Sequence, residues 1–400
     1  MMKKNAFIPK LTFMLAVCFL SLNTIAGDLK TGSAAVKITP PPGAPLAGYY
    51  YDRAADGVHD DLFAKAIVFE KDGVKAVVIS CDLISVPAEI VSAARKLIEK
   101  NTGISPGYVM ISATHSHTGP VMPKKIDRYN NLRNAAYVKY LSQLPGLIAE
   151  SAILANSALA DAKLSVGKGH EESISFNRRF FMTDGTVGWN PGKLNPRIIE
   201  PAGPIDPEVY VLYAETIEEK PLATLVNFAL HLDNVGGTEI SADMPFTLSS
   251  ILGRVKGSEM VTLFAQGCAG NINHINVRTK DPQKGHGEAQ RIATVLSGEV
   301  LKTYTRMKVL DIDNISASQE IVRLKLPDVS PDELPGALEV ISRTGKPDAP
   351  AFLELVNAHK VVDVLDRNGE PVNSRVAPGS GEILAERALA LLNGLKSAGQ

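Results

Sequence analysis

Histidine side chains that could do chemistry gather at three places along the sequence, each directly after an apolar run. The clusters are Thr114–Pro120, His231–Asn234 and Gln266–His274, and they contain four of the eight histidines. Each apolar run predicts a buried strand, so each cluster follows a strand end. In α/β folds, ligands bind in the crevice at the carboxyl ends of the strands. The sequence therefore predicts that these clusters share one site.

Two histidines of the first cluster have the spacing of metal ligands. His115 and His117 are two residues apart, so both imidazoles point to the same side of an extended segment. This arrangement suits two ligands, or one ligand beside an acid/base partner; a hydrogen-bonded pair that stabilises the loop is the alternative. His231 at a second strand end favours the metal site. Imidazoles without a thiolate cluster suit zinc, with iron and manganese as alternatives.

Other polar residues near the predicted strand ends are weaker candidates. Asp61 precedes a strand and Asp82 follows one, which are positions where turn and cap residues are equally common. His59 and Asp60 lie beside them, and His274 belongs to the third cluster. The remaining histidines are expected on the surface or in helices: His170, His286 and His359.

The first cluster follows a predicted unit of strand, helix and strand. Phe63–Glu70 and Val74–Cys81 are apolar runs joined by a short turn, and the apolar spacing over Val86–Ile98 predicts a helix that stops at Gly103. Tyr108–Ala113 is the next strand. Strands joined through a helix are parallel, so part of the sheet is expected to be parallel.

The rest of the chain continues this alternation. We predict a helix over Leu132–Leu159 that breaks near Pro145, and a functional loop or flap over Ser173–Asp206. Three further strands and a helix are predicted at Val209–Ala214, Leu222–Leu230, Val261–Ala265 and His286–Tyr304. The expected fold class is α/β, with a mixed, partly parallel central sheet flanked by helices.

The chain divides into three predicted parts. Residues 1–26 are a signal peptide, 27–310 the α/β domain, and 311–400 a short helical C-terminal annex with too few strands for a core of its own. Within the annex we expect, in order, a strand, two helices, a loop and a last helix, at Ile315–Leu326, Pro331–Ile341, Pro350–Val364, Gly369–Gly381 and from Glu382.

The N-terminus has the pattern of a secretory signal. Lys3, Lys4 and Lys10 are basic, Leu11–Leu20 is apolar, and Thr24–Ala26 offers small residues before a cleavage point. The apolar run is shorter than the ~20 residues that span a bilayer, so no stable membrane span is expected. We therefore expect a secreted or periplasmic protein. Removing the signal, with its three lysines and no acid, changes the net charge from −1 to −4.

Composition and missing motifs exclude several function classes. The chain is 45% apolar and 21% charged, which is typical of a globular protein, and a net charge of −1 disfavours nucleic acid and anionic membranes as partners. No GxSxG, GxxxxGK[ST], strand-coupled GxGxxG or HExxH motif occurs, which disfavours serine esterases, NTPases and Rossmann oxidoreductases. Cys81 and Cys268 end apolar runs and are predicted to be buried thiols, with a disulfide as the alternative.

Six blocks of the sequence resemble the amidase domain of neutral/alkaline, non-lysosomal ceramidases, in the same order. The family's SGTHTHSGP run is nearly reproduced around His115, and the resemblance spans roughly residues 30–310. The blocks are Gly48–Ile67, Cys81–Leu83, Ser112–Pro120, Asn177–Arg178, Asn227–His231 and Gln266–Asn273. The resemblance implies an exported zinc amidohydrolase that cleaves an N-acyl bond in a small amide or lipid-like substrate.

The resemblance also implies roles for individual residues. His115 and His231 would be zinc ligands, and His117 the neighbouring acid/base or transition-state histidine. Arg178 would polarise the substrate carbonyl. The implied chemistry is the attack of zinc-activated water on the amide carbon, with the oxyanion held by metal and guanidinium.

The chain departs from the family pattern at several positions. Where ceramidases have NxGDxSPN, Asn271 replaces the Asp and Asn273 the Ser; we expect Asn273 at a catalytic position, and Asn271 and His274 in contact with substrate. Ceramidases complete the zinc site with a later Glu and Tyr. Glu382 is the candidate for the Glu, and no tyrosine follows Tyr304. No counterpart of the family's immunoglobulin-like C-terminal domain is expected within these 400 residues, and a truncated C-terminus is the alternative to a divergent one.

Two hypotheses of function follow. The first is a zinc hydrolase of ceramidase type that acts on an N-acyl sphingoid lipid or another amide or ester. The second is a ceramidase-like binding protein that has lost turnover, which would account for Asn271, Asn273 and the missing ligands.

Overall fold

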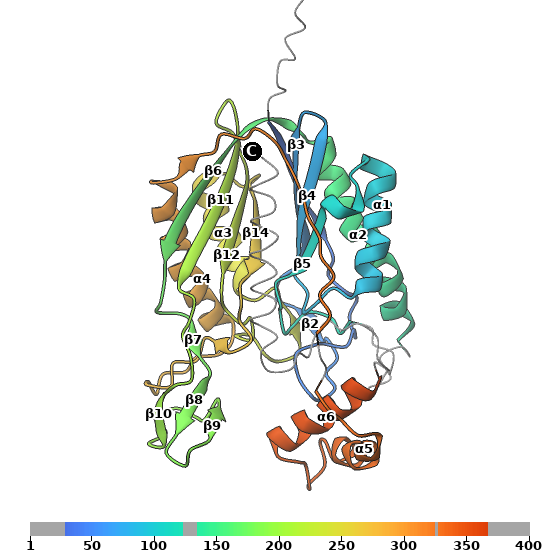
Figure 1. Ribbon diagram of the computed structural model, residues 1–400, viewed down its shortest axis with the longest axis vertical. Coiled ribbons are helices and arrows are strands. Elements are labelled where there is room, and N and C mark those ends of the chain that lie inside the picture. The colour runs from blue at the N-terminus through green and yellow to red at the C-terminus, as the bar shows by residue number, and fades with distance from the viewer. Residues whose placement is uncertain (1–28, 123–133, 325–326, 367–400) are drawn as a thin grey trace, which may run out of the picture.

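The computed structural model describes residues 29–122, 134–324 and 327–366. Its core is a nine-stranded mixed sheet in the order β14-β12-β11-β6-β1-β3-β4-β5, with β16 paired to β6. The sheet folds so that its two halves face each other, with α1 and α2 covering one half and α3 and α4 the other (Figure 1). This confirms an α/β fold with a mixed, partly parallel sheet flanked by helices.

The first half of the sheet contains the predicted unit of strand, helix and strand. It comprises β1 (Lys30–Lys37), β3 (Phe63–Lys71), β4 (Val74–Cys81) and β5 (Val109–Ala113). The turn between β3 and β4 places Asp72 and Gly73 at φ 50° and 80°, and β5 is parallel to β4. Between β4 and β5, α1 (Ala88–Thr102) ends at Gly103 with φ 73°, as its sequence predicts.

The second half of the sheet repeats this arrangement. β6 (Ala160–His170), β11 (Glu208–Thr216) and β12 (Pro221–Phe228) are antiparallel neighbours. The chain then passes through α3 (Met244–Lys256) to β14 (Val261–Gln266), which is parallel to β12. α4 (His286–Tyr304) packs beside α3. Both β5 and β12 therefore direct their carboxyl ends, and the histidines after them, to one region.

Pro145 does not break the helix that contains it, contrary to the prediction. α2 is continuous over Ala135–Ser157, with Asn134 as its N-cap. Pro145 removes the backbone N–H that would bond the carbonyl of Leu141. Buried side chains before and after it, Tyr137 and Ile148 among them, pack on the sheet and hold the helix in one piece.

The segment predicted as an irregular flap contains small strands. β8 (Arg179–Met182), β9 (Val187–Trp189) and β10 (Ile198–Pro201) form a three-stranded sheet that extends from one end of the molecule (Figure 1). β7 (Phe176–Asn177) pairs with β15 (Ile272–Asn273), which fastens the flap to the third histidine cluster.

The C-terminal segment is helical, as expected, but lacks the strand predicted at Ile315–Leu326. Residues 315–324 form no strand, since Ile315 packs on the core beside Leu310 and Ile312 without a neighbouring ladder. Only β16 (Lys308–Val309) joins the sheet after α4 within the described residues. α5 and α6 match the two predicted helices, at Leu334–Ser342 and Phe352–Asp366.

Some of the predicted segments lie outside the described residues, whereas two of the cysteines lie within them. The signal peptide, the loop at Gly369–Gly381 and the last helix from Glu382 lie outside the described residues. Both described cysteines are free: Cys81 is buried as predicted, whereas Cys268 is exposed. No helix among the described residues is long and apolar enough to cross a membrane.

The contact between β1 and α2 generates a stability prediction. A Cβ atom at Gly32 would lie 2.1 Å from the Ala155 carbonyl oxygen, so Gly32→Ala forces strand and helix apart. We expect it to lower the free energy of unfolding by about 1–3 kcal/mol in urea denaturation. Gly298→Ala in α4, where a Cβ meets nothing within 4 Å, should instead raise that free energy by roughly 0.5–1 kcal/mol. Equal effects of the two substitutions would contradict this packing.

Candidate metal centre

Three imidazoles from the two halves of the sheet meet at one point. His115 and His117 follow β5, and His231 follows β12. The Nε2 atom of His117 lies 3.3 Å from Nε2 of His115 and 3.0 Å from Nε2 of His231. One ligand atom from each of the three lies within 4.8 Å of the others, which is the spacing of a metal centre. We call His115, His117 and His231 the histidine triad.

Backbone carbonyls set the tautomers of two triad members. Nδ1 of His115 lies 2.9 Å from the carbonyl oxygen of Ile84, and Nδ1 of His231 lies 3.2 Å from that of Ala269. Because a carbonyl only accepts, each Nδ1 carries the proton and each Nε2 has a free lone pair. Metal-binding histidines are commonly held in this way.

The triad is kept uncharged at neutral pH. Burial and the neighbouring imidazoles lower the pKa of His117 to about 3. Burial and the Arg178 guanidinium lower the pKa of His231 to about 4, and burial also lowers the pKa of His115. Metals bind the neutral imidazole, so at neutral pH these side chains are in the form that a metal ion requires.

Arg53 holds the backbone of the segment that carries His115 and His117. Its Nη2 donates to the His117 carbonyl oxygen at 2.8 Å, and its guanidinium also bonds the carbonyls of Ala47 and Gly237. The same guanidinium lies 4.1 Å from the centre of the Tyr49 ring, which meets the His117 ring edge-on. A buried arginine thus ties three loops together around His117.

Arg178 lies close enough to the triad to influence its titration. Its Nη2 and Nε donate to the carbonyl oxygen of Gly270 at 2.7 and 3.2 Å, and Trp189 lies 4.2 Å from the guanidinium carbon. Arg178 is only 8% exposed, and its burial lowers its pKa from the usual 12.5. The pairing of β7 with β15 brings this residue, Asn271 and Asn273 together.

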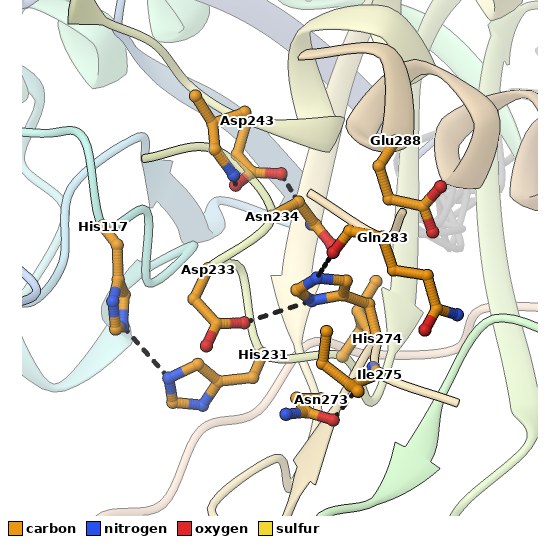
Figure 2. A network of polar contacts seen from close by, with 12 residues as sticks. His117, His231, Asp233, Asn234, Asp243, Asn273, His274, Ile275, Gln283 and Glu288 are labelled. Carbon is orange, nitrogen blue, oxygen red and sulfur yellow. Dashed lines mark hydrogen bonds and ion pairs between the residues drawn. The ribbon is translucent and has the colours of Figure 1, made fainter. Parts of the chain in front are cut away.

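Asp233 is a carboxylate at this site to which the sequence analysis gave no role. Its Oδ1 lies 3.3 Å from Nδ1 of His274, while Nε2 of His274 faces the carbonyl oxygen of Gln283 at 2.8 Å (Figure 2). Both nitrogens of that imidazole face acceptors, which only the doubly protonated ring can satisfy. Burial opposes both charges, but the contact between them outweighs it, so the pKa of His274 is raised and that of Asp233 lowered to about 2.

The loop that carries Asp233 is held by Asp243 at the N-terminus of α3. Oδ1 of Asp243 accepts hydrogen bonds from Asn234 Nδ2 at 2.7 Å and from the Met244 N–H at 2.6 Å, and Oδ2 accepts from the Val235 N–H at 3.0 Å (Figure 2). The chain just after His231 is therefore fixed by a buried carboxylate. These hydrogen bonds help to hold His231 and Asp233 in position.

The two asparagines that replace family residues occupy different settings. Asn273 is 1% exposed; its Nδ2 donates to Asn190 Oδ1 at 2.9 Å and its Oδ1 accepts from the Ile275 N–H at 3.0 Å. Asn271 is half-buried, and its carbonyl oxygen accepts from the Arg178 N–H at 2.9 Å. Their catalytic and substrate-binding roles stay predictions, as does that of His274. Glu382 lies outside the described residues.

The weaker sequence candidates lie apart from the triad. Oδ1 of Asp60 accepts from the Ala242 N–H at 2.7 Å and its Oδ2 from Ser241 Oγ at 2.6 Å. His59 and His286 stack with ring centres 3.5 Å apart, and their ligand atoms lie close enough to one of Asp60 to form a second group that could hold a metal ion. Their sequence separation gave no signal for this contact.

The C-terminal annex contacts a loop of the site. Tyr50, next to Tyr49, lies with its ring centre 5.0 Å from His359 and 6.0 Å from Phe352, both on α6. In Figure 1, α5 and α6 lie at the end of the molecule toward which the flap also extends. The annex therefore helps to enclose the region beyond the strand ends.

Solved ceramidase structures have a fold similar to that of this chain. The structure of neutral ceramidase from Pseudomonas aeruginosa matches with a TM-score of 0.58 and 21% identity, over 70% of this chain and 45% of that one. The chain has a neutral ceramidase-like fold. A ceramidase complexed with C2 matches with a TM-score of 0.57 and 21% identity, over 70% of this chain and 44% of that one. No family model and no curated protein matches the sequence.

The neutral ceramidase-like fold agrees with the resemblance seen in the sequence blocks, and the match covers only part of each ceramidase. The chain matches less than half the length of each ceramidase.

Gly48 provides a test of how the triad is positioned. A Cβ atom there would lie 2.5 Å from Cβ and 2.7 Å from Nδ1 of His117, so Gly48→Ala must displace the imidazole. We expect zinc affinity, measured by calorimetric titration, to fall about tenfold or more. Gly43→Ala in the same loop has a similarly positive φ, but its nearest contact would be 3.4 Å away. This control should keep its zinc affinity; a matching loss there would show that loop strain, and not the imidazole, is responsible.

Proposed function

We propose that the chain is an exported, zinc-dependent amidohydrolase that cleaves the N-acyl bond of a lipid-like amide. The observation that carries this proposal is the convergence of three neutral imidazoles, two of them anchored by backbone carbonyls, on a neutral ceramidase-like fold. Anchored imidazoles without thiolates are the donor set of catalytic zinc sites that keep a position open for substrate or water.

The residues present fit a zinc ion. His115 and His231 would hold it through Nε2, with His117 close enough to serve as a third ligand or as the acid/base group beside it. Zinc, when bound, supplies a Lewis acid that polarises a carbonyl and acidifies water. The carboxylate of Asp233 places a negative charge beside the triad, which offsets part of the positive charge of such an ion.

Arg178 is suited to hold the oxygen of the scissile carbonyl. Its guanidinium keeps its charge at neutral pH, is buried under Trp189 and is oriented by the Gly270 carbonyl. A fixed cation in a site shielded from water stabilises a developing oxyanion more than a mobile one would, because it needs no reorientation. His117 is then the group best placed to take a proton from the attacking water and to pass it to the departing amine.

The proposed substrate and location rest on the ceramidase likeness and the sequence. The two structures compared above are ceramidases, which supports a neutral, lipid-like amide. The basic, apolar and small-residue pattern of residues 1–26 supports export to a secreted or periplasmic location.

A ceramidase-like binding protein without turnover is the second candidate. The resemblance puts Asn273 at the position of the family's serine, and both ends of its side chain are hydrogen-bonded, one to Asn190 in the flap and one to the Ile275 N–H. Such a protein would bind zinc and amide without releasing the acyl group. Zinc binding with no hydrolysis of any N-acyl amide would favour this candidate.

Metal content tests the proposal directly. We expect about one zinc per chain in purified protein, measured by plasma mass spectrometry, because the three Nε2 atoms converge. His115→Ala and His231→Ala should each lose it, whereas His170→Ala, which alters an exposed histidine paired with Glu172, should retain it. A wild-type protein that takes up no zinc would end the proposal.

Arg178→Ala tests the oxyanion role. Removal of a preorganised charge donor should lower kcat/KM for hydrolysis of an N-acyl sphingoid amide about 10²–10³-fold. Its neighbour Arg179 is exposed on β8, so Arg179→Ala is the matched control and should retain nearly full activity. Thermal unfolding of both variants separates catalysis from folding. Undiminished turnover by Arg178→Ala would remove this residue from the mechanism.

A further inference from the structure

Two histidines outside the triad lie face to face where solvent reaches them. The rings of His59 and His286 have centres 3.5 Å apart and planes 11° apart. His59 directly follows β2 (Gly57–Val58), and His286 is the first residue of α4, so the fold brings them together from distant parts of the sequence. Their side chains are 40% and 32% exposed, which leaves both imidazoles accessible to an ion from solution.

A buried carboxylate sets the tautomer of His59. Oδ2 of Asp60 accepts from Nδ1 of His59 at 2.8 Å, so in the neutral ring Nε2 has a free lone pair. Asp60 also accepts from the Ala242 N–H at 2.7 Å and from Ser241 Oγ at 2.6 Å. With both oxygens in use and only 2% of its side chain exposed, Asp60 orients His59 and leaves coordination to others. A carboxylate behind the histidine is the usual arrangement around a bound metal.

A second carboxylate, that of Glu239, lies beside His286. β13 (Glu239–Ile240) pairs with β2, which places Glu239 opposite Gly57. Its Oε2 lies 3.9 Å from Nε2 of His286, which is longer than a hydrogen bond. The Glu239 side chain is 55% exposed, so it has room to approach an ion held by the two imidazoles.

The donor atoms and their spacing favour zinc. Two nitrogens bound to one tetrahedral zinc ion are roughly 3.4 Å apart, close to the separation of the two ring centres. The rings need to tilt so that both lone pairs meet at one ion, and their exposure permits this tilt. Two imidazoles and one carboxylate are donors that zinc prefers, whereas calcium and magnesium prefer oxygen donors alone.

We propose that His59, His286 and Glu239 form a second zinc site. His59 binds through Nε2 and Glu239 through its carboxylate, and Asp60 is the positioning residue behind His59. The site shares no residue with the triad, so it does not depend on the proposed hydrolysis. It offers fewer imidazoles than the triad and is more open to water. We therefore expect it to fill only when zinc is added to the purified protein.

An ion here would fasten the segments that surround the loop after His231. The Gly285 N–H, just before α4, donates to the Asn234 carbonyl oxygen at 2.6 Å. The nearby Gln283 carbonyl faces Nε2 of His274. By joining His286 to the chain at β2 and β13, the ion would hold this stretch in place, so its role is structural.

Zinc titration of a chain without the triad tests the proposal. We expect His115→Ala/His231→Ala to bind one equivalent of added zinc, measured by calorimetry. Adding His59→Ala or His286→Ala should abolish that binding. His170→Ala is the matched control, because His170 is an exposed histidine beside Glu172, and it should leave the binding unchanged. Zinc binding by the triad-free chain would stand even if the wild-type protein hydrolyses no amide.

Two results of this titration would overturn the proposal. One is the absence of zinc binding in the triad-free chain, which would leave the two imidazoles as a stacked surface pair only. The other is displacement of the zinc by about a hundredfold excess of calcium, which would assign the binding to carboxylates and not to imidazoles.

Asp60→Asn tests the positioning role. The amide can donate to Nδ1 of His59, which moves the ring proton to Nε2 and blocks coordination there. We expect zinc affinity to fall about tenfold or more. Equal affinity in this variant would remove Asp60 from the site.

Wild-type protein keeps the test decisive if the triad-free chain does not fold. After the first equivalent of zinc, further zinc should raise the melting temperature, because the ion joins segments that are separate in the sequence. This second rise should be lost in His286→Ala and kept in His170→Ala. An equal second rise in His286→Ala would overturn the proposal.

Discussion

The close approach of the two halves of the sheet is the constraint on which the site depends. Side-chain hydroxyls bridge the halves directly: Ser80 Oγ donates to the Phe264 carbonyl oxygen at 2.6 Å, and Ser33 Oγ to that of Leu222 at 2.7 Å. β5 belongs to one half and β12 to the other, so this contact sets how near His117 can come to His231. The hydroxyls of Ser116 and Thr118, on either side of His117, also donate to the Ser241 carbonyl oxygen and hold this segment against the chain that follows His231.

The histidines could be predicted from the sequence because the physics that places them is local. An apolar run predicts a buried strand, and in a sheet with parallel strands the residues after several strand ends meet. His115, His117 and His231 followed from that rule, and so did the pairing of β4 with β5. The neutral ceramidase-like fold, which covers 70% of the chain, was expected from the resemblance of six sequence blocks and not from the strand-end rule.

The features that sequence reasoning missed depend on contacts between distant residues. Asp233 follows His231 by two residues, but it forms an ion pair with His274, which lies in another cluster of the sequence. Pro145 suggests a broken helix until the packing of both helix halves on the sheet is known. Ile315 is apolar, as a strand residue would be, but its side chain packs on the core without the chain joining the sheet. Tertiary packing overrides local preference in each case.

The loop before β15 links two chemical functions through consecutive peptide groups. The carbonyl of Ala269 orients His231, and the carbonyl of Gly270 orients Arg178. The imidazole that would hold a metal and the guanidinium that would hold an oxyanion therefore share one piece of backbone. An insertion here would displace both groups at once. The described part of the annex supplies no carbonyl to either group, so it is not subject to this constraint.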